Sequence, residues 1–218
     1  MSRIRLAPRL LVPLNRFCAI ATKHQKDFVL IGGAAVTMHA LDYFRMTTDL
    51  DINVENVKWI PKAFKHAGGD VEWLYKPTTG GALAATLTYL HPVDAIRLDL
   101  AIPPRERLDL FVKHSVVTPC GIRYLDIPPL LAAKIESFGD RHERKTEKRA
   151  SDYSDIEHLL SRMDQLKLKM PGDVKEMLLT PHVLSKFFNR VPEQDKETMV
   201  AFLHDLGICT GADIWRAL

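Results

Sequence analysis

Two aspartates separated by one residue follow a pair of glycines near the start of the chain. Asp49 and Asp51 lie in an apolar run, and residues two apart on a strand project from the same face of a sheet. Such carboxylates repel each other unless a cation lies between them, and Mg²⁺ prefers carboxylate and phosphate oxygens. Gly32 and Gly33 end an earlier apolar run, residues 28–31, and a glycine turn that feeds a helix offers N–H groups to phosphate. The pattern predicts a phosphate-binding turn beside a metal site.

In this order, the glycines and aspartates resemble the DNA polymerase beta-like nucleotidyltransferase superfamily. Its members carry Gly-Gly or Gly-Ser after a strand, then a helix, Asp-x-Asp on the next strand and a third carboxylate on a later strand. Asp99 is the candidate for the third carboxylate, because its neighbours Leu98 and Leu100 direct it to the face opposite the apolar one. The resemblance implies that Asp49, Asp51 and Asp99 are catalytic and bind two Mg²⁺ or Mn²⁺ ions.

The segment that begins at Arg45 is more specifically similar to the AbiEii type, whose known members include toxins of bacterial toxin–antitoxin systems. It reads Arg-x-Thr-x-Asp-x-Asp and ends at Asp51. One departure concerns the second glycine position, which is often serine in the superfamily; Gly33 offers only backbone donors. The alternative interpretation is a βαβ-like start, in which the glycines only allow close helix–strand packing and the aspartates are solvated.

A second region extends the same resemblance. AbiEii-like proteins carry a helix with a lysine, an arginine-rich turn and an Asp-x-x-Asp helix, which here correspond to Lys134, Arg141, Asp152 and Asp155. The resemblance implies that Lys134 contacts the triphosphate and that Asp152 orients Lys134 or the attacking group. The family often has Arg or Lys directly before the first Asp, where this chain has Ser151. The alternative is that Lys134 and Asp155 are surface residues in ordinary helix pairs.

Taken together, the resemblance of these motifs implies a metal-dependent nucleotidyltransferase that moves an NMP from an NTP to a hydroxyl acceptor, either an RNA or tRNA end or a protein. Asp99 could also act as the base that removes the hydroxyl proton. A non-catalytic nucleotide-binding or partner-binding protein of the same fold is the alternative. The motifs specify neither the nucleotide nor the acceptor nor an oligomeric state. The predicted nucleotide-binding residues are Gly32, Gly33, Arg45, Thr48, Lys134 and Arg141.

The composition is that of an ordinary globular protein. The chain has 218 residues, 46% hydrophobic and 26% charged, with a net charge of +3, too little to indicate nucleic-acid binding by itself. The basic run 141–149 is either a solvated segment or a site for triphosphate or an RNA backbone. The three cysteines are far apart and match no zinc spacing, which favours a reducing compartment.

The N-terminal segment is compatible with more than one cellular compartment. No apolar run reaches the roughly 18 residues of a membrane span, so we expect a cytoplasmic protein with no membrane partner. No acidic residue precedes Asp27, while arginines recur, a composition that also suits a mitochondrial presequence. Apolar residues at helical spacing favour a helix packed on its own domain instead. They are Leu10, Leu11, Leu14, Phe17, Cys18 and Ala21.

Periodicity predicts an α+β fold of two parts. Residues 1–126 form a catalytic domain with a mixed sheet flanked by helices, and residues 127–218 form a helical domain that closes the nucleotide cleft. We expect the site in the groove between the parts. Apolar residues of the last helices, such as Phe187 and Phe202, indicate a core or a partner-binding patch. Strands are predicted at 28–31, 49–54, 71–75, 84–90, 96–102, 112–118 and 122–125; helices at 9–24, 33–41, 61–67, 105–110, 127–138, 148–163, 173–178, 181–190, 193–206 and 211–217.

Overall fold

The protein divides into two compact units, Met1–Asp126 and Ile127–Leu218, and each is described by itself. A computed structural model describes residues 6–40, 43, 45–65, 72–79, 83–91, 94–142 and 146–209. The unit boundary falls where the sequence predicts a domain boundary, while the roles assigned to the two parts stay predictions. Several predicted features lie wholly or partly outside the described residues: the helix 211–217, the ends of the helices 33–41 and 61–67, the start of the strand 71–75 and the middle of the basic run 141–149.

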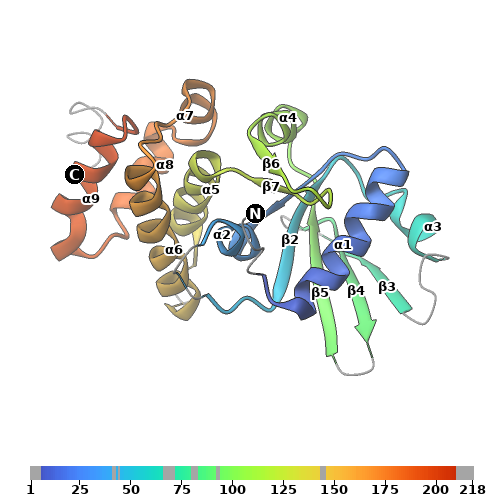
Figure 1. Ribbon diagram of the computed structural model, residues 1–218. Coiled ribbons are helices and arrows are strands. Elements are labelled where there is room, and N and C mark those ends of the chain that lie inside the picture. Colours follow the sequence, from blue (N-terminus) through green and yellow to red (C-terminus); the bar gives the residue numbers. More distant parts are fainter. Residues whose placement is uncertain are drawn as a thin grey trace. The chain divides into compact units, whose positions relative to one another are not determined.

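The first unit combines a sheet with four helices in the residues that the structure describes (Figure 1). Seven described strands form one mixed sheet in the order β3-β4-β5-β2-β1-β7-β6, with β2–β5 and β1–β7 parallel and the other pairs antiparallel. This arrangement confirms the predicted α+β class. The elements are α1 (Pro8–Lys23), β1 (Phe28–Ile31), α2 (Gly32–His39), β2 (Asp49–Val54), α3 (Ile60–Lys65), β3 (Glu72–Pro77), β4 (Ala85–His91), β5 (Asp94–Ala101), α4 (Arg105–Lys113), β6 (Ser115–Val117) and β7 (Arg123–Leu125).

Strict alternation along β2 and β5 gives the sheet one apolar and one polar face. Leu50 and Leu98 are fully buried and lie side by side in the register, while the intervening residues point the other way. Helix α1 packs on the apolar face, where the Phe17 ring lies 5.7 Å from that of Phe28 on β1 (Figure 1). The predicted N-terminal helix therefore packs on its own unit, and the compartment stays a prediction. The aspartates of β2 and β5 at positions 49, 51 and 99 therefore lie on the opposite, polar face of the sheet.

The region after β5 differs from the prediction. We expected a short helix over 105–110 and a strand from Val112, but α4 runs on to Lys113 and the hairpin begins at Ser115. Leu108 and Phe111 recur at helical spacing and are buried, so helical burial prevails over the β-propensity of Val112.

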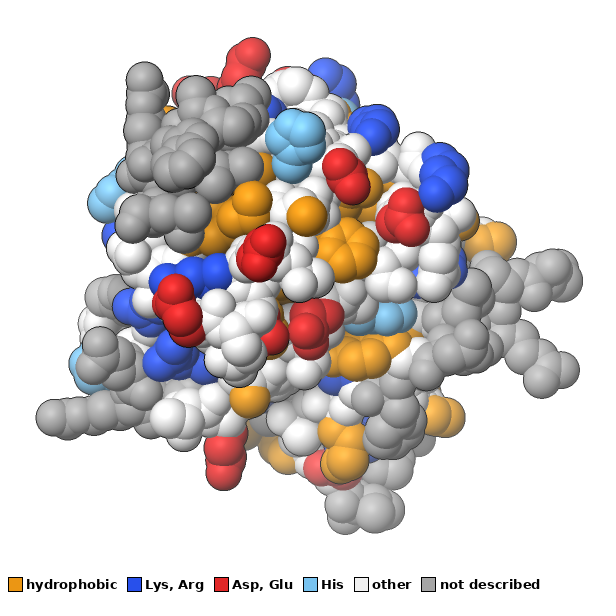
Figure 2. Space-filling model, turned by 90° about the vertical axis from the view of Figure 1, so that its left-hand side faces the viewer, with side chains coloured by type: hydrophobic (Ala, Val, Ile, Leu, Met, Phe, Trp, Pro, Cys, Tyr) orange, Lys and Arg blue, Asp and Glu red, His pale blue; other side chains and the backbone are white. Residues whose placement is uncertain are grey.

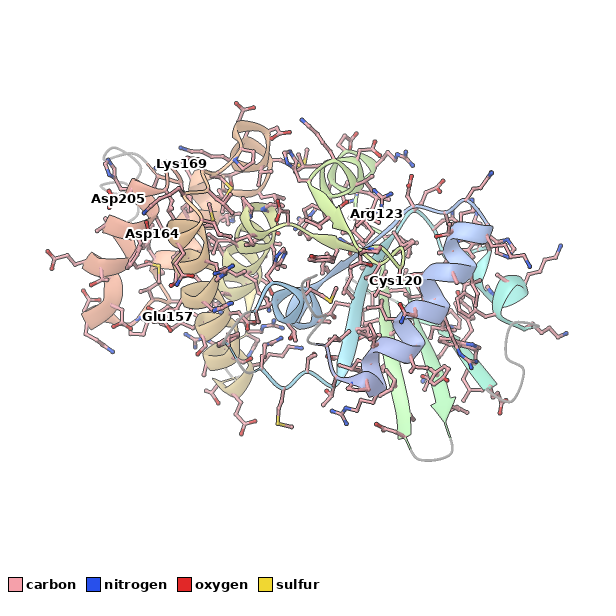
Figure 3. All side chains as sticks on the ribbon, in the orientation of Figure 1. Cys120, Arg123, Glu157, Asp164, Lys169 and Asp205 are labelled. Carbon is pink, nitrogen blue, oxygen red and sulfur yellow. The ribbon has the colours of Figure 1, made fainter. Side chains whose placement is uncertain are left out.

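The second unit contains only helices in the residues described. Its elements are α5 (Ile127–Asp140), α6 (Thr146–Gln165), α7 (Gly172–Leu178), α8 (Pro181–Phe188), the 3₁₀ turn η1 (Glu193–Asp195) and α9 (Lys196–Asp205). Helix α8 begins at Pro181 because the Thr180 side chain accepts a hydrogen bond from the Val183 N–H and proline suits the first helical position. At the end of α9, the Lys169 ammonium donates to the carbonyl oxygen of Asp205 (Figure 3).

The apolar residues of the last helices mostly form the core. Phe187 packs against Phe138 of α5, with ring centroids 5.7 Å apart, and both rings are buried. Phe202 is the exception, with 41% of its surface exposed. Within the described part of the chain, no helix has both the length and the apolar character needed to cross a membrane.

Candidate active site

The parallel pairing of β2 with β5 places the predicted acidic residues in neighbouring positions. The register aligns Asp51 with Asp99 and Asp49 with Arg97, so all four side chains leave the polar face of the sheet. Asp99 is buried although it is acidic. The strand register therefore sets the three carboxylates on neighbouring positions of one face of the sheet, although Asp99 is distant from the other two in the sequence.

Arg97 lies between two of these carboxylates. Its Nη2 is 2.9 Å from Asp99 Oδ2 and 3.3 Å from Asp49 Oδ2. Asp99 Oδ1 also faces the Thr86 hydroxyl, 3.5 Å away on the neighbouring strand β4. The guanidinium thus occupies the position of a counter-cation in the acidic row.

The glycine pair is in contact with the same row. Gly32 adopts a left-handed conformation, φ +64°, and a Cβ at this position would lie 2.0 Å from Asp51 Oδ2. A Cβ at Gly33 would lie 1.3 Å from Arg45 Nη1. Glycine is required at Gly32 for the turn from β1 into α2 and for the close approach of the carboxylate. The Gly-Gly and Arg-x-Thr-x-Asp-x-Asp segments therefore form one site.

Replacing Gly32 by alanine should destabilise the first unit and displace the Asp51 carboxylate. We expect a loss of about 2–4 kcal/mol in the free energy of unfolding, since a left-handed φ and a steric clash combine. The matched control is Gly121→Ala, because Gly121 also has a positive φ, +84°, with nothing within 4 Å of an added Cβ. Urea unfolding of both variants measures the difference. Equal losses in the two variants would show that Asp51 does not approach Gly32 closely.

Thr47, the threonine of the Arg-x-Thr-x-Asp-x-Asp segment, lies in the loop before β2 and was not among the predicted nucleotide-binding residues. The Thr47 hydroxyl lies 3.2 Å from the carbonyl oxygen of Asp49 and 3.4 Å from its Oδ1. Thr48, the predicted nucleotide-binding residue, is exposed. Thr47 therefore orders the start of β2, and the role of Thr48 stays a prediction.

The first unit offers ligands of the kind that a divalent metal requires. Its carboxylates suit Mg²⁺ or Mn²⁺, and Arg97 already supplies a positive charge between two of them. Among the described residues, no three acidic, histidine or cysteine side chains are already gathered around a common point. The physical reason is that Arg97 separates Asp49 from Asp99, while Asp51 faces Gly32. The residues fit a metal, and a rearrangement of their side chains would be needed to bind it.

The second unit contains a buried network of the other predicted residues. Lys134 Nζ lies 2.9 Å from Asp152 Oδ1 and 2.7 Å from Asp155 Oδ2, and Arg141 Nη2 lies 2.5 Å from Asp152 Oδ2. Lys134, Asp152 and Asp155 are all buried, so the interpretation of Lys134 and Asp155 as surface residues is wrong. Asp152 contacts Lys134, while its role in orienting Lys134 and the triphosphate contacts of Lys134 and Arg141 stay predictions.

The network changes the acid–base behaviour of Asp152. Burial by itself raises the pKa of this carboxyl, but the charges and hydrogen bonds of Lys134 and Arg141 outweigh burial and hold its pKa below the ordinary value. The ionised form of Asp152 is therefore favoured in the folded protein. Its contribution to stability is present above the unfolded-state pKa of about 3.9 and is lost as the pH falls through the lowered folded pKa.

The variant Asp152→Asn should remove this part of the acid sensitivity. We expect its free energy of unfolding to fall less steeply than that of the wild type as the pH drops below about 4. The control is Asp140→Asn, because Asp140 is exposed and lies in a surface pair with Lys186. Urea unfolding, measured at intervals of about one pH unit between pH 5 and pH 2, tests this expected difference in slope. A slope for Asp152→Asn equal to that of the control would contradict it.

A small cavity lies apart from this network in the second unit. It measures 180 Å³ and is lined by residues of α6, η1 and α9, among them Tyr153, Glu157, Asp195 and Phe202. The Tyr153 hydroxyl donates to Asp195 Oδ2 at 3.2 Å, and burial together with Asp195 raises the pKa of Glu157 (labelled in Figure 3). Apolar and acidic side chains also lie side by side on the face shown in Figure 2. None of the predicted site residues lines this cavity.

Comparison with known proteins identifies the family to which these motifs correspond. A family model described as nucleotidyl transferase AbiEii toxin, type IV TA system, matches residues 17–199. The match spans both units and includes every predicted site residue. No curated protein matches the chain.

Two solved structures share the fold over nearly the whole chain. An antigenic nucleotidyltransferase-like protein from Paracoccidioides brasiliensis aligns with a TM-score of 0.68 and 17% identity, over 95% of this chain and 97% of its own. JHP933 from Helicobacter pylori aligns with a TM-score of 0.52 and 15% identity, over 97% of this chain and 90% of its own. At such identities the likeness is one of fold, and it agrees with the mixed sheet and the following helices.

Proposed function

We propose a specific reaction for this chain, which belongs to the AbiEii nucleotidyltransferase family and is thus a nucleotidyltransferase enzyme. The chain moves an NMP from an NTP to a hydroxyl group. That hydroxyl group belongs to an RNA end, such as that of a tRNA, or to a protein. The observation that carries the proposal is the alignment of Asp51 with Asp99 on parallel strands, with Asp49 on the same face and Gly32 against the Asp51 carboxylate. Acidic residues gathered beside a glycine turn match the needs of metal-assisted phosphoryl transfer.

In the proposed reaction, the acceptor hydroxyl oxygen forms a bond to the α-phosphorus while the bond between the α-phosphorus and the bridging oxygen breaks. Pyrophosphate leaves with that oxygen, and the hydroxyl proton goes to a base. Asp99 is the candidate base, because its carboxylate leaves the polar face of the sheet beside Asp51 and lies 3.5 Å from the Thr86 hydroxyl. The chain mainly contributes positioning and charge, since this transition state needs little covalent chemistry from the protein.

Asp49, Asp51 and Asp99 would hold the Mg²⁺ or Mn²⁺ ions that the family implies. When bound, such ions stabilise charge on the phosphates and lower the pKa of the attacking hydroxyl. The start of α2 at Gly32 and Gly33 supplies backbone N–H groups for a phosphate oxygen, and Arg45 lies against Gly33. We also propose that Lys134 contacts the triphosphate and that Asp152 and Asp155 orient its ammonium group.

The proposal is tested by label transfer. The full-length protein is incubated with Mg²⁺ or Mn²⁺, each α-labelled nucleoside triphosphate in turn, and the RNA or the protein fraction of a cell extract. We expect label on one fraction with one nucleotide, and no label with an Asp49→Ala/Asp51→Ala variant. Such a result would identify donor and acceptor class together. Bound triphosphate without transfer to either fraction would favour a non-catalytic nucleotide-binding protein.

A further inference from the structure

We propose that Arg97 is a displaceable internal cation, which occupies the acidic row in the absence of metal and opposes the binding of a divalent ion until the nucleotide is present. The proposal rests on the proposed metal-dependent function and adds a control element to it. Its basis is that Arg97 Nη2 lies 2.9 Å from Asp99 Oδ2 and 3.3 Å from Asp49 Oδ2. One guanidinium thus bridges two carboxylates that are predicted metal ligands.

The position of Arg97 follows from strand geometry. Arg97 precedes Asp99 by two residues on β5, so both side chains leave the same face, and the parallel register sets Arg97 opposite Asp49. Arginine keeps its positive charge at any physiological pH. Every folded molecule therefore carries a cation within reach of both carboxylates, whatever the pH.

Because the Arg97 side chain is exposed, its displacement from the carboxylates requires little free energy. Its side chain is 57% exposed, whereas that of Asp99 is only 8% exposed. Ion pairs with so exposed a partner contribute little to stability, typically less than about tenfold in an equilibrium. A released guanidinium can be solvated without breaking the core of the sheet. Asp99, in contrast, stays in the sheet with Thr86 beside it.

Divalent metal and guanidinium compete for the same oxygen atoms. A free metal ion must replace Arg97, while a metal ion that arrives with a triphosphate gains further ligands from phosphate. We infer that the wild-type protein binds Mn²⁺ weakly by itself and more tightly together with an NTP. This order would limit metal occupancy when no substrate is available.

The test measures Mn²⁺ binding to the full-length protein by electron paramagnetic resonance, without any turnover. We expect Arg97→Gln to bind Mn²⁺ more tightly than the wild type in the absence of nucleotide, by about threefold and by less than about tenfold, and Arg97→Lys to stay near the wild type. Arg105→Gln is the matched control, because Arg105 forms an exposed pair with Asp109 on α4 of the same unit. It should bind Mn²⁺ as the wild type does.

A second measurement in EDTA separates competition from loss of folding. Without metal, Arg97→Gln should melt about 2–4 °C below the wild type, because the carboxylates lose their counter-cation. Adding Asp99→Asn to this variant should restore the melting temperature and abolish the gain in Mn²⁺ binding.

The outcomes distinguish this inference from the proposed function. If Asp99→Asn weakens Mn²⁺ binding but Arg97→Gln binds no more tightly than the wild type, Arg97 does not compete and the metal site stands. If Asp49→Asn and Asp99→Asn both bind Mn²⁺ as the wild type does, the metal assignment itself is wrong, and the role of Arg97 falls with it.

Discussion

An Asp51→Asn variant should lose nucleotidyl transfer almost completely and keep its fold. Asparagine has the same shape, so the close approach to Gly32 is preserved, while the charge that a metal requires is removed. Loss of metal-based stabilisation of the transition state is worth several kcal/mol, a rate loss on the order of 10³ or more. The rate is measured by label transfer to the cell fraction, RNA or protein, that accepts label from the wild type, with both variants at equal protein concentration.

The control for Asp51→Asn is Asp109→Asn, since Asp109 is an exposed residue of α4 that pairs with the side chain of Arg105. It should transfer label at the wild-type rate. Urea unfolding should give Asp51→Asn a free energy within about 1 kcal/mol of the wild type, because one member of a row of like charges is removed. Transfer by Asp51→Asn at near the wild-type rate would refute the metal assignment.

The sequence was sufficient to predict the elements that carry the first part of the site. The strands 28–31 and 49–54 were predicted with their observed bounds, because the apolar run 28–31 ends before Gly32 and the alternation of polar and apolar residues begins at Asp49. The pairing of Asp51 with Asp99 follows from the parallel β2–β5 register, which local periodicity does not specify. The family resemblance supplied Asp99 as the third carboxylate on a later strand, but not its register with Asp51.

Two contacts of the site were missed although a signal existed for each. Arg97 stands two residues before Asp99 in a predicted strand, so period-two spacing alone places it on the acidic face. Asp155 follows Asp152 by one helical turn, which predicts a shared face but not burial. Burial of Asp155 depends on the packing of α5 against α6, where Lys134 supplies its counter-charge. Side-chain pairs of this kind are decided by tertiary packing, which composition does not reveal.

The buried network explains why Lys134 should matter for stability as well as for chemistry. Removing one member of a buried ion pair typically costs about 3–5 kcal/mol, because the remaining charge has lost its partner in a medium of low dielectric constant. Lys134 serves two buried carboxylates at once, Asp152 and Asp155. Asp152 keeps Arg141 after such a change, whereas Asp155 loses the charge of Lys134.

Replacing Lys134 by methionine should therefore lower the free energy of unfolding by about 3–5 kcal/mol, and the double variant Lys134→Met/Asp155→Asn should recover most of that loss. The matched control is Lys186→Met, because Lys186 pairs with Asp140 at the surface of the same unit and should cost less than about 1 kcal/mol. Urea unfolding measures all three variants. A double variant as unstable as the single one would show that Asp155 is not the residue that needs Lys134.

The same double variant separates structure from catalysis. If Lys134 contacts the triphosphate as proposed, the variant Lys134→Met/Asp155→Asn should remain folded. Its rate of label transfer should nevertheless be lower than that of the wild type by at least about 10²-fold, because the positive charge of Lys134 no longer stabilises the phosphates. The Michaelis constant for the NTP and the maximal rate should both change, whereas a purely structural role predicts wild-type kinetics once stability is restored. Wild-type kinetics in the stable double variant would limit Lys134 to holding α5 and α6 together.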